Sequence, residues 1–155
     1  MLNAANLPAR AREKTLQNQK TLKSILIVGS DEHHRMLLGA LLSEEGHTVL
    51  TCGSSIEALN RLQQGGIQFV IIDHLPPELN GLSLLKRIKE RNLTVPVLFI
   101  SARYEVEPYL AAVNLGALDY LGKPIDYADI QRIVDTHESL YSRTKRKYNV
   151  VLDED

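Results

Sequence analysis

Three short stretches of the chain are apolar at every position: ILIV at residues 25–28, FVII at 69–72 and VLFI at 97–100. A β-strand presents its side chains to both faces in turn, so a strand without polar residues must be covered on both faces. A parallel sheet flanked by helices provides that environment. The predicted strands are residues 25–28, 47–52, 68–72, 95–100 and 117–121. The sequence therefore predicts an α/β fold.

Stretches with the apolar spacing of helices separate these strands. They are expected at residues 32–45 and from about Ser54, Gly81, Glu107 and Asp126 onward. The first carries Leu37, Leu38, Leu41 and Leu42 on one face, and the last carries Ile130, Ile133, Val134 and His137 at helical spacing. The second begins with a capping box, in which the Ser54 and Glu57 side chains satisfy free backbone amides. Parallel strands need right-handed crossovers, so helices must lie on both faces of the sheet. The pattern predicts a (βα)5 doubly wound sheet.

Composition divides the chain into three parts. We expect one domain at residues 24–140, a basic and flexible extension at residues 1–23, and a charged tail at residues 141–155. Residues 25–140 carry nine basic and fifteen acidic side chains, which argues against nucleic acid as the ligand. A single cysteine, Cys52, excludes an internal disulfide framework. No apolar run is long enough to cross a membrane. The N-terminus lacks the apolar core of a signal peptide and the single cysteine fits a reducing compartment, so a cytoplasmic location is expected.

Polar residues follow four of the predicted strands. Gly29, Ser30 and Asp31 follow the first, Asp73 the third, Ser101 the fourth and Lys123 the fifth. In a doubly wound sheet, ligands bind beyond the carboxyl ends of the strands. One carboxylate, one hydroxyl and one ammonium group are therefore expected at the same edge. Taken singly, they could also be an Asx-turn, a helix cap and a solvated lysine.

Three segments of the sequence, VIIDHLPPELNGLSLLKRI, VPVLFISAR and GALDYLGKPI, resemble the receiver domains of bacterial response regulators. Asp73, Pro77 and Gly81 keep the D-x-x-x-P-x-x-x-G spacing of that family. Ser101-Ala102 and Lys123-Pro124 match its other two motifs. The resemblance covers residues 24–140. It implies a CheY-like, flavodoxin-like fold with strand order 2-1-3-4-5.

The resemblance also implies a role for each matching residue. Asp73 would accept a phosphoryl group from a histidine kinase or a phosphotransfer protein. Ser101 and Lys123 would contact the phosphoryl oxygens, and the Lys123 peptide bond to proline would be cis. Tyr120 would change rotamer when Ser101 moves. Mg²⁺ would be held by Asp73, by the backbone carbonyl of Leu75, and by two acidic residues after the first strand.

The sequence departs from the family after the first strand, because Gly29 and Ser30 stand where the acidic pair is expected. Asp31 and Glu32 come two positions later, where an acidic first helical turn is favoured by the helix dipole. Mg²⁺ demands near-ideal octahedral geometry and tolerates displaced ligands poorly. We therefore expect Ser30 and Asp31 to be weak metal ligands, and phosphorylation to be weak or absent.

Three functions remain open at this stage. The leading one is a response-regulator receiver that signals through its fourth helix, fifth strand and fifth helix to a downstream protein or a second copy. It is expected to be a phosphoacceptor rather than an enzyme, and either a single-domain regulator or a fragment. The second is a pseudo-receiver, an interaction module that works without phosphorylation. The third is a flavodoxin-like binder of a nucleotide or flavin.

Three histidines are expected on the surface. His33 and His34 are neighbours on the first helix, so their side chains diverge by about 100° and cannot share one metal ion. His74 follows Asp73 in the sequence and is expected to face solvent.

Overall fold

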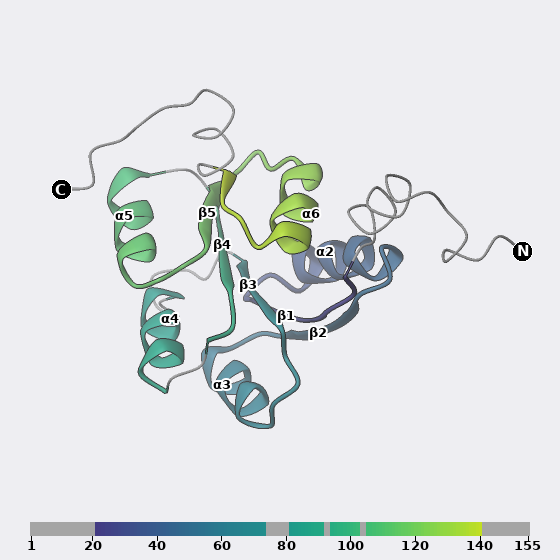
Figure 1. Ribbon diagram of the computed structural model, residues 1–155, viewed down its shortest axis with the longest axis horizontal. Helices are drawn as coiled ribbons and strands as arrows, with labels where there is room; N and C mark the ends of the chain where they lie inside the picture. The colour runs from purple at the N-terminus through teal and green to yellow at the C-terminus, as the bar shows by residue number, and fades with distance from the viewer. Residues whose placement is uncertain (1–20, 74–80, 92–93, 103–104, 141–155) are drawn as a thin grey trace, which may run out of the picture.

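The computed structural model describes residues 21–73, 81–91, 94–102 and 105–140 (Figure 1). Within these residues five strands alternate with five helices, as the apolar pattern predicts. The strands are β1 Ser24–Gly29, β2 Thr48–Cys52, β3 Phe69–Asp73, β4 Val97–Ser101 and β5 Asp119–Gly122. The helices are α2 Glu32–Glu44, α3 Ser55–Gln63, α4 Gly81–Glu90, α5 Val106–Asn114 and α6 Tyr127–Thr136. Apart from residues 21–23, the predicted terminal extensions lie outside the described residues.

The strands form one parallel sheet in the order β2-β1-β3-β4-β5, which confirms the predicted doubly wound topology. Helices α2 and α6 cover one face, and α3, α4 and α5 cover the other (Figure 1). The winding changes direction between β1 and β3. The carboxyl ends of these two strands are therefore the place where this topology positions a ligand.

Strand β1 shows why the central strands are wholly apolar. Ile25 and Ile27 join the cluster under α2 and α6, whereas Leu26 and Val28 join the cluster under the other three helices. All four side chains are at most 1% exposed. Because successive side chains of a strand point to opposite faces of the sheet, β1 contributes side chains to both cores.

Side chains cap three of the helices at their N-termini. Ser54 accepts a hydrogen bond from the Glu57 backbone N–H at 3.3 Å, which confirms the predicted capping residue. The Glu57 carboxylate accepts in return from the Gly53 N–H at 3.2 Å, one residue earlier than the usual capping box. Asp31 and Asp126 cap α2 and α6 in the same way.

Two helical faces differ from expectation. The spacing predicts Leu37 on the inner face of α2, but its side chain is 57% exposed, while Leu38 and Leu42 are buried. That prediction is wrong because the face of α2 that packs on β1 and β2 is centred on Leu38 and Leu42, and Leu37 lies about 100° around the helix from Leu38. His137 does not extend α6: it ends the helix in the left-handed conformation, with its N–H donating to the Ile133 carbonyl. None of the helices described is long and apolar enough to span a bilayer.

Asp119 fastens the segment that follows α6 to the sheet. Its carboxylate is buried at the start of β5 and accepts hydrogen bonds from the Tyr120 and Leu140 backbone N–H groups, at 2.8 and 2.9 Å. Desolvation raises the pKa of Asp119, and the two hydrogen bonds oppose that shift in part. Ionisation of this carboxyl group therefore costs more in the folded chain than in the unfolded chain.

The raised pKa of Asp119 predicts a pH-dependent effect of the Asp119→Asn substitution. The contribution of Asp119 to stability is greatest below its unfolded pKa and falls as pH rises through its folded pKa. Asparagine cannot ionise, so its contribution does not change with pH. The free energy of unfolding of the wild type should therefore exceed that of the variant by less at pH 7 than at about pH 3.5, which is close to the ordinary pKa of a carboxyl group. Urea unfolding of both proteins across this range measures the difference. An advantage that grows with pH would contradict the prediction.

Candidate functional site

The residues predicted to form a site lie at one edge of the sheet. Gly29 and Asp73 end β1 and β3 and are paired in register, and Ser101 ends β4 beside Gly122 of β5. The backbone N–H of Lys123 donates to the Ser101 carbonyl at 3.1 Å, which ties the last two strand ends together. The sequence therefore placed these positions at a common edge, although their chemical roles stay predictions.

The side chain in contact with Asp73 is His34, from the first turn of α2. Asp73 is 2% exposed, and its Oδ2 atom lies against Nδ1 of His34 in a short hydrogen bond or ion pair. Its Oδ1 atom is buried and has no hydrogen-bond partner among the residues described. Both carboxylate oxygens are thus withdrawn from solvent.

The predicted surface position holds only in part for His34, whose side chain is 30% exposed and contacts the buried Asp73. His33 is exposed, as expected. The sequence does contain the missed signal, because His34 precedes the buried Leu38 and Leu42 by one and two helical turns. The residue therefore shares the inner face of α2. His74 lies outside the described residues.

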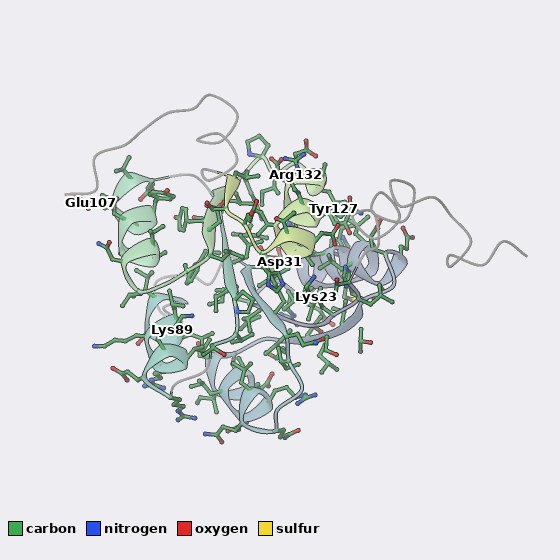
Figure 2. The ribbon with its side chains drawn as sticks, in the orientation of Figure 1. Lys23, Asp31, Lys89, Glu107, Tyr127 and Arg132 are labelled. Carbon is green, nitrogen blue, oxygen red and sulfur yellow. The ribbon has the colours of Figure 1, made fainter. Side chains whose placement is uncertain are left out.

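The described residues do not fit a magnesium ion. Gly29 brings no side chain, and a Cβ atom added there would lie 2.6 Å from the Asp73 carbonyl oxygen. The Asp31 carboxylate (labelled in Figure 2) caps α2, accepting from the His34 backbone N–H at 3.2 Å. That hydrogen bond lowers the pKa of Asp31. Within the described ranges, no three His, Cys, Asp or Glu residues gather as a metal site, and Leu75 lies outside them.

Arg35 places a positive group at the end of β1. Its guanidinium Nη1 donates a hydrogen bond to the Gly29 carbonyl oxygen. Its Nε atom is buried, with no hydrogen-bond partner in the described part of the chain. A cationic side chain therefore contacts Gly29, one of the two positions where the family places a carboxylate. This arrangement opposes cation binding through simple electrostatic repulsion.

The remaining predicted residues are placed as follows. Ser101 and Lys123 are partly exposed, and the Lys123–Pro124 peptide bond is cis, as the resemblance implies. No ion pair joins the Lys123 amine to Asp73 among the residues described. Tyr120 is buried, stacks on Phe99 at 6.3 Å between ring centroids, and meets Tyr109 edge-on at 6.2 Å.

Comparison with known proteins matches residues 25–135 to the family described as response regulator receiver domain. The transcriptional regulatory protein ZraR of Escherichia coli is 36% identical over 111 residues, which cover 72% of this chain and 25% of ZraR. The DNA-binding transcriptional regulator NtrC of the same organism is 30% identical over 129 residues, 83% of this chain and 28% of NtrC. The chain thus spans about a quarter of the length of these relatives.

Solved structures agree with this match. The receiver domain of the Francisella response regulator 1452 is 28% identical, with a TM-score of 0.69, and the match covers 79% of this chain and 99% of that domain. The beryllofluoride-activated NtrC4 receiver domain dimer is 25% identical, with a TM-score of 0.67 and coverage of 73% and 93%.

Proposed function

The chain belongs to the response regulator receiver domain family, and from this premise we propose that Asp73 accepts a phosphoryl group in two-component signalling, with weakened magnesium-dependent chemistry. The donor is a histidine kinase or a phosphotransfer protein. The observation that carries the proposal is the position of Asp73, which ends β3 at the sheet edge shared with Ser101 and Lys123. That edge is where doubly wound sheets bind ligands.

The proposed reaction makes an acyl phosphate on Asp73. A carboxylate oxygen attacks the phosphorus of a phosphohistidine, the P–N bond breaks, and the imidazole leaves with the electron pair and takes up a proton. The transferred group brings a charge of about −1.5 to −2. Ser101 and Lys123 would contact its oxygens. Since phosphoryl transfer depends mainly on positioning and electrostatic stabilisation, the missing acidic pair should make the step slow.

The output surface of the proposed receiver is formed by α5, β5 and α6. Val106, Leu110 and Val113 form an exposed apolar stripe on α5 at helical spacing. Beside it, Tyr109 and Tyr120 line a hollow of about 380 Å³. Exposed apolar surface of this kind marks protein-binding sites. The partner is a downstream protein or a second copy of this chain.

A second candidate function is a pseudo-receiver that binds its partner without phosphorylation. The contact between His34 and Asp73 favours it, because both oxygens of the acceptor carboxylate are covered. In this function, Asp73 would serve only to hold the loops at the sheet edge.

Incubation with acetyl phosphate and Mg²⁺, followed by intact-mass measurement, separates the two candidates. The wild type should slowly gain one phosphoryl group, because Asp73 is the acceptor, and Asp73→Ala should gain none. Asp126→Ala is the matched control: it removes another aspartate, the cap of α6, and should leave labelling unchanged. A wild type that stays unlabelled supports the pseudo-receiver. Labelling that persists in Asp73→Ala would show that the acceptor lies elsewhere.

A further inference from the structure

We propose that His34 shields the phosphoacceptor carboxylate, so that its imidazole must leave Asp73 before Asp73 can react. The shielding contact is a property of the resting protein. Its effect on reactivity rests on the proposed function of Asp73.

The contact covers the reacting atoms directly. A carboxylate must present a free oxygen lone pair to attack phosphorus. In Asp73, Oδ2 is engaged by His34 Nδ1, and Oδ1 is buried. A hydrogen bond to a charged group is stronger than one between neutral groups. Any reaction at this carboxylate must first break the hydrogen bond to His34, and this raises the activation free energy of the reaction.

The fold fixes His34 in this place from both sides. Its own backbone N–H is held by the Asp31 side chain at the N-terminus of α2. The next residue, Arg35, is bound to the Gly29 carbonyl at the end of β1. Two anchors within one helical turn hold the backbone at His34, so that its side chain can reach the end of β3.

A neighbouring space can receive the displaced ring. His34 lines a small, mostly apolar hollow of about 130 Å³ between α2 and α6, together with Leu38, Ile125 and Tyr127. A side-chain rotation therefore suffices to uncover Asp73, and the helix itself need not move. Rotamer changes of this kind are faster than movements of whole helices.

Urea unfolding of a double-mutant cycle tests the contact without any phosphoryl chemistry. The cycle comprises wild type, His34→Ala, Asp73→Ala and the double variant. The two substitutions should be coupled by about tenfold in the unfolding equilibrium constant, or about 1.4 kcal/mol. His33→Ala, which removes the neighbouring exposed histidine, should show no coupling to Asp73→Ala. Coupling no larger than that of His33 would overturn the proposal.

The labelling rate with acetyl phosphate tests shielding itself. His34→Ala should be labelled about tenfold faster than wild type or more, since the lost hydrogen bond no longer holds the carboxylate. His34→Gln keeps an N–H donor at this position and should restore slow labelling, whereas His33→Ala should behave as wild type. Equal rates in wild type and His34→Ala would overturn shielding.

The two experiments separate this inference from the function on which it rests. If the cycle shows coupling but neither wild type nor His34→Ala is labelled, the contact is supported and Asp73 is not a phosphoacceptor. If both are labelled at equal rates, Asp73→Ala is not labelled and coupling is absent, Asp73 is the acceptor and His34 does not shield it.

Discussion

Replacing Gly29 with aspartate, the residue type that the family places there, is expected to lower the free energy of unfolding by about 3 kcal/mol or more. Gly29 is buried, and an added Cβ atom would lie 2.6 Å from the Asp73 carbonyl oxygen and 3.3 Å from its Cβ atom. The neighbour at the shorter distance is backbone of a central strand, so it cannot move aside cheaply. The new carboxylate would also face that of Asp73.

The effect can be measured by urea unfolding of Gly29→Asp at neutral pH. Ser30→Asp is the matched control, because the same charge enters an exposed position one residue later. We expect that control to lose less than about 1 kcal/mol, as surface substitutions usually do. Equal stability of Gly29→Asp and wild type would show that β1 and β3 can separate enough to admit a side chain.

Much of the fold could be predicted because its signals are local. Uninterrupted apolar runs indicate strands buried on both faces, and Ser54 with Glu57 marks a helix start. The strand ends shifted by up to two residues, since hydrogen bonding with neighbouring strands decides where a strand stops. The inward position predicted for Leu37 was wrong because several leucines at helical spacing do not show which of them lie at the centre of the buried face.

The sequence predicts which residues of the site lie at the strand ends, but it does not predict which side chains contact one another there. Topology brings the ends of β3, β4 and β5 to one edge, and this follows from the strand order alone. The contact between His34 and Asp73 depends on where α2 begins relative to the end of β3, and the Asp31 side chain caps that beginning. The prediction for His34 considered only its neighbour His33. The spacing of four residues between His34 and Leu38 places both on the same face of α2.

Replacement of the acidic pair predicts that the protein binds Mg²⁺ far more weakly than an intact receiver site would. The described part of the chain brings one carboxylate, Asp73, to the strand ends, and its Oδ2 atom is engaged by His34. Arg35 adds positive charge at the end of β1. A divalent cation would have to displace the imidazole, approach the guanidinium, and take most of its ligands from water.

Isothermal titration calorimetry of the metal-free protein with MgCl₂ tests the central claim that the strand ends of this receiver domain lack the side-chain ligands for Mg²⁺. Only heats of dilution are expected when Mg²⁺ reaches millimolar concentrations, in wild type and in Asp73→Ala alike. Saturable binding to wild type with a millimolar or tighter Kd, abolished in Asp73→Ala, would contradict it.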